Sequence, residues 1–258
     1  MTEKHVEQPD ERGFVVPCAR LSVNAPFRWL RRGWADLVRS PRISALFGVI
    51  IVVVSVLVSA FAWWLGRFAL LAALLSGFVF IAPLIGVGLY SVSRRLEQAR
   101  QPSFRASHRL AMRVVGQAAV FALLQLVIIL LWSRAGMMVA AFVPVRESDP
   151  TTLLEFLLIG SAVGSVFAVA TFAAAAFSLP MIADRDVDMI TACLSSVNAV
   201  LRNKCVCLLW ALLIAVLTAL GFATAFVGLG IIMPWLAYAS WHAYRETLDA
   251  GEWPALPE

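Results

Sequence analysis

The stretch 205–244 contains no Asp, Glu, Lys or Arg, and this absence restricts the fold more than any other feature of the sequence. A helix needs about 20 apolar residues to cross a bilayer, so the stretch is too long for one crossing and long enough for two. Gly221, Gly228 and Gly230 predict a tight hairpin between the two crossings. Backbone groups find no water inside hydrocarbon, so both crossings must be helical. The stretch therefore predicts an all-α membrane protein.

Composition extends this prediction to the whole chain. Of the 258 residues, 61% are hydrophobic and 14% are charged, whereas soluble domains carry about a quarter charged residues. The apolar runs predict six transmembrane helices, at 43–65, 68–93, 114–132 and 153–179 and as two helices within 205–244. A further run at 136–145 is too short to cross, which favours an interfacial or re-entrant piece. Pro180 is predicted to stop the fourth span.

Two polar intervals show the periodicity of one-faced helices, and both are expected to lie flat in the membrane surface. In the first, Phe27, Leu30, Trp34 and Leu37 lie opposite Arg28, Arg31, Arg32, Asp36 and Arg39, and Pro41 ends the helix. In the second, 184–203, the apolar side is Val187, Ile190, Leu194, Val197 and Leu201, and the polar side is Asp188, Thr191, Ser195, Asn198 and Arg202. Asp184 or Asp186 is expected to cap the second helix.

Basic residues indicate how the helices are oriented. With the N-terminus inside the cell, 18 of the 21 Lys and Arg residues fall in cytoplasmic segments, as the positive-inside rule requires. Both termini are therefore predicted to be cytoplasmic, with residues 1–23 as a mobile tail and 24–258 as a single membrane domain. The expected partner of the arginines is anionic phospholipid rather than nucleic acid, with contacts at Arg28, Arg31, Arg32, Arg94 and Arg95.

An internal similarity links the two ends of the membrane domain. Segments 24–97 and 184–248 each contain a surface helix followed by a hairpin with a proline, so that Pro83 aligns with Pro234 and Arg94 with Arg245. One interpretation is a parallel duplication, as in several transporter folds. The other is that any two apolar hairpins with the same orientation look alike.

Few residues suggest chemistry, because the predicted span interiors carry almost no ionisable side chain. Gly160, Gly164 and Ala168 form a stripe of small residues, which indicates either a face for another membrane protein or packing within the bundle. The cluster of Asp184, Arg185, Asp186 and Asp188 suits a divalent metal or phosphate, or else helix capping and pairing with basic loops. His242, beside Trp241, is either a haem or metal ligand or part of an aromatic belt. No second histidine is predicted at similar depth, so no haem or metal site is predicted. The sequence contains none of the common catalytic or nucleotide-binding motifs, so no cofactor and no catalytic residue are predicted.

Three segments resemble a proteobacterial family of predicted integral membrane proteins of unknown function. They are Leu179-Pro180 followed by 184–188, the ending 241–245 that includes Arg245, and 83–95 with its Gly86-Val-Gly88-Leu-Tyr90 core. The resemblance covers nearly the whole chain after the tail. Some relatives are described as putative cytochrome c oxidase subunits, so the resemblance implies a bacterial inner membrane and a respiratory association. It supplies no catalytic residues.

These observations favour a non-catalytic accessory, assembly or stabilising subunit of an inner-membrane complex, rather than an enzyme. The alternative is a transporter or channel for a small solute, built on the two-fold similarity, which requires a water-filled cavity between Pro83 and Pro234. A third hypothesis is a membrane enzyme that acts on lipid at the edge 184–188.

Overall fold

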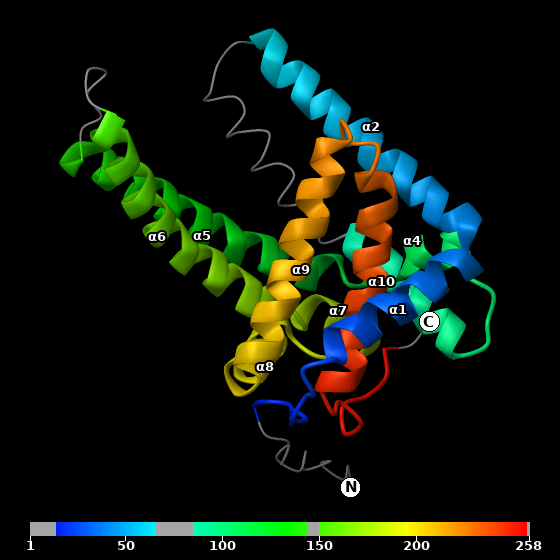
Figure 1. Cartoon of the computed structure of the whole chain (residues 1–258). Coiled ribbons are helices and arrows are strands. Elements are labelled where there is room, and N and C mark those ends of the chain that lie inside the picture. The colour runs from blue at the N-terminus through cyan, green and yellow to red at the C-terminus, as the bar shows by residue number, and fades with distance from the viewer. Residues whose placement is uncertain (1–13, 66–84, 144–149, 257–258) are drawn as a thin grey trace, which may run out of the picture.

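The computed structural model of the chain describes residues 14–65, 85–143 and 150–256 (Figure 1). The helices are α1 (Ala25–Arg39), α2 (Pro41–Leu65), α4 (Phe104–Arg113), α5 (Val115–Phe142), α6 (Pro150–Ala175), α7 (Ser178–Asp184), α8 (Met189–Arg202), α9 (Lys204–Ala223) and α10 (Leu229–Thr247). A further helical segment covers 85–97. In these ranges extended pairing is restricted to two isolated bridges, Cys18 with Leu248 and Arg185 with Ala255. The predicted all-α class is therefore confirmed.

Among the described residues, four helices are long and apolar enough to cross a membrane: Pro41–Phe61 in α2, Val115–Phe142, Thr151–Asp184 through α6 and α7, and Lys204–Ala223. These correspond to the first, third, fourth and fifth predicted spans. Most of the second predicted span lies outside the described residues. The sixth predicted span corresponds to α10, whose last turns carry His242, Arg245 and Glu246, and it is not among the four.

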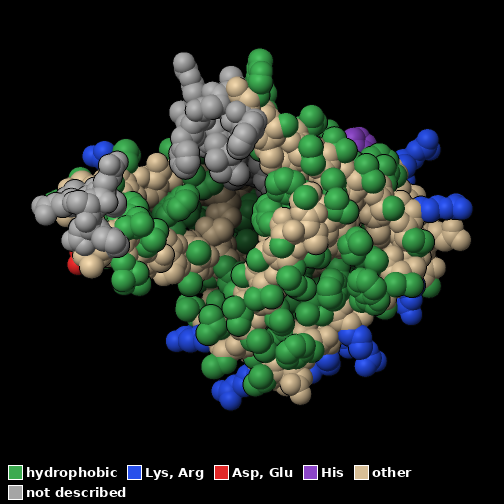
Figure 2. All heavy atoms as spheres, turned by 45° about the horizontal axis from the view of Figure 1, so that its top comes forward, with side chains coloured by type: hydrophobic (Ala, Val, Ile, Leu, Met, Phe, Trp, Pro, Cys, Tyr) green, Lys and Arg blue, Asp and Glu red, His purple; other side chains and the backbone are tan. Residues whose placement is uncertain are grey.

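The arrangement of the helices is shown in Figure 1. α1 packs across α10, which also packs against α2 and α9. Trp29 of α1 and Trp210 of α9 are fully buried at this junction, and their rings meet edge to face with centroids 5.5 Å apart. α5 and α6 pack on each other and extend away from α2, α9 and α10 (Figure 1). Figure 2 shows one face of the molecule, largely covered by hydrophobic side chains, with most Lys and Arg side chains near its rim.

The prediction of a separate short piece at 136–145 is wrong, because residues up to Phe142 continue the single helix α5. Ser133 and Arg134 interrupt the apolar sequence just before this piece. Both side chains are exposed on the helix surface. An arginine can extend its charged end toward an interface without interrupting the backbone hydrogen bonds, so the pair does not end the helix.

The prediction that Pro180 stops the fourth span is also wrong. α6 ends at Ala175, and a new helix, α7, begins at Ser178 with Pro180 in its first turn. Backbone N–H groups of the first turn have no partner within the helix, so the missing N–H of a proline is tolerated there. The apolar chain therefore continues past Pro180 as far as Asp184.

α8 begins later than the sequence predicted. Asp184 ends α7, and the N-cap of α8 is Asp188, whose carboxylate accepts a hydrogen bond from the Thr191 N–H at 2.9 Å. Neither Asp184 nor Asp186 caps this helix. Partial burial raises the pKa of Asp188, but hydrogen bonds from the side chain and N–H of Thr191 and from the Ile190 N–H lower it by more. The pKa of this carboxyl therefore lies below its ordinary value.

The loss of this cap is predicted to lower the free energy of unfolding by about 1 kcal/mol in the D188A variant. Asn is an equally good N-cap, so D188N should stay close to wild type near neutral pH. The folded pKa is below the unfolded one, so the contribution of the charge is present above the unfolded pKa and lost as the pH falls through the folded pKa. Thermal unfolding of wild type, D188A and D188N in detergent, from neutral to acidic pH, measures both effects. A D188N protein as unstable as D188A at neutral pH would contradict it.

α8 turns its small polar residues toward the protein. Ser195 and Ser196 are fully buried, whereas Ile190, Leu194 and Leu201 are exposed. The Ser195 hydroxyl accepts a hydrogen bond from the Val16 N–H at 2.9 Å, and that of Ser196 accepts one from the Phe177 N–H at 3.1 Å. The small polar side chains therefore join α8 to the rest of the protein. The large apolar ones face outward, as on a membrane surface.

The predicted hairpin within 205–244 is confirmed, but of its three glycines only Gly228, the N-cap of α10, lies in the turn between α9 and α10. The residues with left-handed backbone angles are Ala225 (φ 51°) and Phe226 (φ 70°). Gly221 instead allows close contact with Leu229, since a Cβ at Gly221 would lie 2.4 Å from the Leu229 Cδ2. Gly230 faces α2, where it meets Gly48.

Both ends of the described chain are bound to the helices. Ala19 N–H donates to the Thr247 carbonyl and Asp249 N–H to the Pro17 carbonyl, both at 2.9 Å. The Asn203 side chain accepts from the Leu21 N–H at 2.9 Å. The predicted mobile tail at 1–23 is therefore wrong for its last residues, because polar side chains on α8 and beside it bind their backbone.

A local motif recurs in the two segments that the sequence aligned. Ser40 separates α1 from α2 with φ −127° and ψ 54°, and Asn203 separates α8 from α9 with φ −121° and ψ 42°. Each break joins a short surface helix to a long apolar helix. This is the geometry expected for the paired segments 24–97 and 184–248, whose origin by duplication stays a prediction.

Candidate functional site

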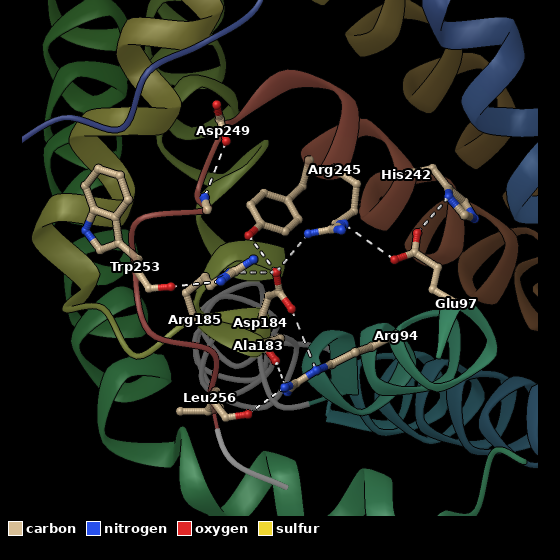
Figure 3. Close-up of polar contacts among 12 residues, drawn as sticks. Arg94, Glu97, Ala183, Asp184, Arg185, His242, Arg245, Asp249, Trp253 and Leu256 are labelled. Atoms are coloured by element: carbon tan, nitrogen blue, oxygen red, sulfur yellow. Dashed lines mark hydrogen bonds and ion pairs between the residues drawn. The ribbon is translucent and has the colours of Figure 1, made fainter. Parts of the chain in front are cut away.

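The candidate site is a partly buried charge network at the polar end of the helices, most of which Figure 3 shows. We define it as Asp36, Arg94, Glu97, Asp184, Arg185, His242 and Arg245. These residues come from α1, the segment 85–97, the end of α7 and α10. Four of them are almost completely buried: Asp36 is 5% exposed, Arg94 6%, Asp184 7% and His242 8%. Charged groups are rarely buried to this extent unless they are paired.

Asp184 is the centre of the network, because four groups approach its carboxylate. The Tyr244 hydroxyl donates to Oδ2 at 2.9 Å, and Arg185 Nε does so at 3.2 Å. Arg245 Nη1 lies 3.4 Å from the same oxygen, and Arg94 Nε lies 3.7 Å from Oδ1. The side chains of three arginines thus converge on one carboxylate (Figure 3).

Arg94 also binds two backbone carbonyls. Its Nη1 donates to the Ala183 carbonyl at 3.0 Å, and its Nη2 donates to the Leu256 carbonyl at 2.5 Å. Ala183 lies in the last turn of α7, where carbonyls lack helical partners and a cation is favoured. Leu256 N–H in turn donates to the Asp184 carbonyl at 2.8 Å. The C-terminal segment is thereby fixed against α7.

Glu97 extends the network from Arg245 to His242. Glu97 Oε2 lies 3.4 Å from Arg245 Nε, and Oε1 lies 3.6 Å from His242 Nδ1. His242 Nε2 lies 2.8 Å from Asp36 Oδ2, the oxygen that also accepts from the Ser93 hydroxyl at 2.7 Å. The continuous path therefore joins α1 to α7 through α10.

The network contains three guanidinium groups (Arg94, Arg185 and Arg245) and three carboxylates (Asp36, Glu97 and Asp184), so its arginines and carboxylates are equal in number. Burial of unpaired charges is costly, and pairing with hydrogen bonds offsets this cost. The arrangement therefore holds together four separate segments of the chain in one geometry. In the order Ser93–Asp36–His242 the carboxylate lies between serine and histidine, unlike a catalytic triad, where histidine occupies the middle.

The structure brings together only part of the predicted cluster at 184–188. Asp184 and Arg185 belong to the network, whereas the side chains of Asp186 and Asp188 are exposed and Asp188 caps α8. Among the described residues, no group of three or more His, Cys, Asp or Glu side chains is placed to hold a metal.

Trp241 and His242 do not form the predicted aromatic belt. Trp241 is 1% exposed and packs edge to face against Tyr244, with centroids 5.8 Å apart. His242 is enclosed by the carboxylates of Asp36 and Glu97. The helical side of α10 that carries them faces the protein interior because α1 covers it.

The small-residue stripe is divided between two environments. A Cβ at Gly164 would lie 3.5 Å from Trp132 Nε1 of α5, whereas a Cβ at Gly160 would have no described atom within 4 Å. Ala168 is exposed.

Asp36, Arg94 and Glu97 were not identified as site residues from the sequence. One signal could have indicated Arg94: the internal similarity aligns it with Arg245, and both arginines contact Asp184. Asp36 was assigned to the polar side of the first surface helix with the arginines. No local pattern showed that it alone turns inward.

The basic residues expected at lipid have varied surroundings. Arg28 pairs with Glu246, and Arg32 Nη1 lies 3.7 Å from the same carboxylate, while Arg31 is exposed. Arg95 Nε donates to the Gln101 carbonyl at 3.0 Å.

Residues 70–184 match the family described as "Predicted integral membrane protein (DUF2189)", which is of unknown function. The matched part is a little under half of the chain; it contains Arg94, Glu97 and Asp184 of the network and does not include α10. No curated protein and no solved structure matches the chain. Together with the four candidate spans, the match indicates what kind of protein this is. The chain is an integral, multi-pass membrane protein.

Proposed function

We propose that the protein is a non-catalytic subunit of a larger membrane assembly. Its attachment surface is the α5–α6 arm, defined as Val115–Phe142 and Pro150–Ala175. The observation that carries this proposal is that the surroundings of the helical glycines differ between the arm and the rest of the protein. The resemblance noted above makes a respiratory oxidase of a bacterial inner membrane the first assembly to test.

Outside the arm, Gly33 and Gly48 allow helices to approach closely. Added Cβ atoms at Gly33 and Gly48 would lie 2.6 Å from the Ala239 N and 2.2 Å from the Gly230 O. In the arm, added Cβ atoms at Gly116, Gly136 and Gly160 would meet nothing within 4 Å among the described residues. A glycine inside a helix costs roughly 1 kcal/mol relative to alanine. Contact with a helix of another subunit, which small residues favour in membranes, gives these glycines a role.

The surface of the arm agrees with this role. The part of the chain that the structure describes buries none of the apolar window in Thr151–Asp184. An apolar cavity of about 330 Å³ lies between α5 and α6, lined by residues that include Met138, Phe142 and Ile159. Lipid covers such a surface equally well, so the test must separate a specific partner from lipid.

The G160L variant is predicted to lose its membrane partner while the protein itself stays folded. Overpacking of a helix contact costs typically 1–3 kcal/mol, so the recovery of the partner should fall roughly tenfold in purification from native membranes with mild detergent. Ala162 is exposed and lies about 200° away around the helix, so A162L is the matched control. A162L should melt at the same temperature as wild type, and G160L at the same temperature or slightly higher, because it replaces a glycine inside a helix.

Two results would contradict the proposal. One is a wild-type protein that migrates alone in native electrophoresis of gently solubilised membranes. The other is a partner that is recovered equally with G160L and A162L. The transporter alternative stays a prediction, because Pro83 lies outside the described residues; its counterpart Pro234 is buried in α10.

A further inference from the structure

The outer side of α1 carries a row of large apolar side chains. Phe27, Trp34 and Val38 are 53%, 46% and 59% exposed. They are seven and four residues apart, so they form one stripe along the helix. Leu30 and Leu37, which the periodicity grouped with Phe27 and Trp34, pack against the protein instead. An exposed apolar stripe of this size marks an interaction surface.

The contacts of α1 with α10 show in which direction the stripe faces. On one side of α1, the Trp34 ring meets Trp235 edge to face, with centroids 5.2 Å apart. On the other side, Arg28 pairs with Glu246, and Arg32 Nη1 lies 3.7 Å from the same carboxylate. Trp235 lies about three turns before Glu246 along α10, toward the apolar hairpin. The stripe therefore borders the apolar part of α10, whereas Arg28 and Arg32 face its charged end.

The place of α1 in the chain brings the stripe to a membrane surface. Only Ser40 separates α1 from the candidate span that begins at Pro41 (Figure 1). Leu46, Val49 and Val53 in the first turns of that span are exposed as well. A helix attached so directly to a span cannot lie far from the bilayer, and tryptophan prefers the boundary between hydrocarbon and water.

The charge of α1 selects the kind of membrane surface. Four of its residues are arginines and one is acidic, and this residue, Asp36, is buried beside His242. Arg31 is exposed and follows Phe27 by four residues, so it borders the stripe. Arg42, at the start of the span, is also exposed. The outer side of the helix thus combines apolar and basic groups, which is the complement of an anionic headgroup layer.

We propose that α1 docks on an anionic lipid leaflet, with Phe27, Trp34 and Val38 among the headgroups and Arg31 bound to a lipid phosphate. A guanidinium group binds phosphate with two parallel hydrogen bonds, which suits arginine to this contact. The docked helix fixes the depth at which the first candidate span enters the bilayer. This surface does not depend on the proposed attachment through the arm.

The first test compares R31Q with R32Q, because both arginines are exposed and only Arg31 borders the stripe. Full-length proteins are delipidated in neutral detergent and titrated with phosphatidylglycerol or phosphatidylcholine, and bound lipid is counted by native mass spectrometry. Wild type and R32Q should prefer phosphatidylglycerol. In R31Q the affinity for phosphatidylglycerol should fall about fivefold, as expected for one arginine at an anionic surface. Equal phosphatidylglycerol binding by R31Q and R32Q overturns the proposed contact.

The second test locates the stripe in a bilayer. A fluorophore is attached to V38C or to R32C in full-length protein in phosphatidylglycerol nanodiscs, after Cys18 and Cys205, the two cysteines that are not buried, are replaced by serine. Phospholipids with a nitroxide at the headgroup should quench the label on V38C several-fold more than the label on R32C. Val38 and Arg32 are exposed, so thermal unfolding should be unchanged.

Two results of the second test would contradict the proposal. Equal quenching of the two labels overturns the orientation of α1. A label on V38C that stays in water overturns the lipid contact and assigns this side of α1 to a soluble partner.

Discussion

Replacing Asp184 with alanine is expected to lower the free energy of unfolding by about 3–5 kcal/mol, because it leaves buried cations without their counter-charge. Arg94 and Asp184 are almost fully buried, and Arg185 and Arg245 approach the same carboxylate. When one partner of a buried ion pair is removed, the remaining charge keeps its full desolvation cost and loses the attraction that offset it. The Tyr244 hydroxyl also loses its acceptor. No other single substitution is expected to affect so many segments.

The matched control is D186A, which removes the same charge from an exposed side chain two residues away. A surface change of this kind is usually worth within about 0.5 kcal/mol. Unfolding in detergent can be followed with a thiol-reactive fluorogenic dye, since Cys193 and Cys207 are buried and free. D184A should react at a melting temperature lower by on the order of 10 °C. If D184A and D186A melted together, Asp184 would not be the centre of the fold at this end.

The second large effect is expected at the crossing of α2 and α10. A Cβ at Gly48 would lie 2.2 Å from the Gly230 carbonyl oxygen and 3.0 Å from its carbon. These are backbone atoms, which cannot move aside as a flexible side chain does. G48A should therefore separate the two helices and weaken the Ser44–Tyr238 hydrogen bond, now 2.9 Å. A loss of about 3 kcal/mol is expected, at the upper end of the usual cost of overpacking.

G136A provides the comparison, because the added methyl meets no described atom within 4 Å. There the intrinsic preference of alanine for helix should dominate, and the variant should be more stable by up to about 1 kcal/mol. The two substitutions are chemically identical, so the opposite signs isolate the effect of packing. Thermal unfolding of both purified proteins measures this difference. A G48A protein as stable as wild type would show that the helices do not approach as closely as the structure indicates.

Hydropathy predicted much of the fold, because the solvent of these helices is the hydrocarbon of a bilayer. Hydrocarbon accepts only long apolar helices, so the runs at 43–65, 114–132 and 153–179 and the first half of 205–244 identified helices that the structure contains. Hydropathy was less informative about where a helix ends, because a single residue can decide this. Arg134 did not break α5, and Pro180 did not end α6. α7 itself begins at Ser178, and Pro180 lies in its first turn. In both cases the backbone tolerates the residue at that position of a helix.

The candidate site was only partly predictable. Asp184, Arg185, His242 and Arg245 were recognisable as polar residues near apolar segments. Their partners Asp36, Arg94 and Glu97 were not, because the contacts join residues up to 206 positions apart. Periodicity shows which residues share a side of a helix. It does not show whether water, lipid or protein covers that side.

α8 illustrates the same limit. Its pattern correctly predicted an amphipathic helix, but Ser195 and Ser196 face the protein, and Ile190 and Leu194 face outward.

The sequence by itself determined the all-helical class, the hairpin near the C-terminus and the concentration of charge at the polar ends of the helices. The reason is that the cost of burying charge and backbone in lipid depends on composition alone. Only the tertiary structure decided which charges pair and which side of each surface helix is buried. Those choices depend on distances between segments far apart in the chain, which no local pattern records.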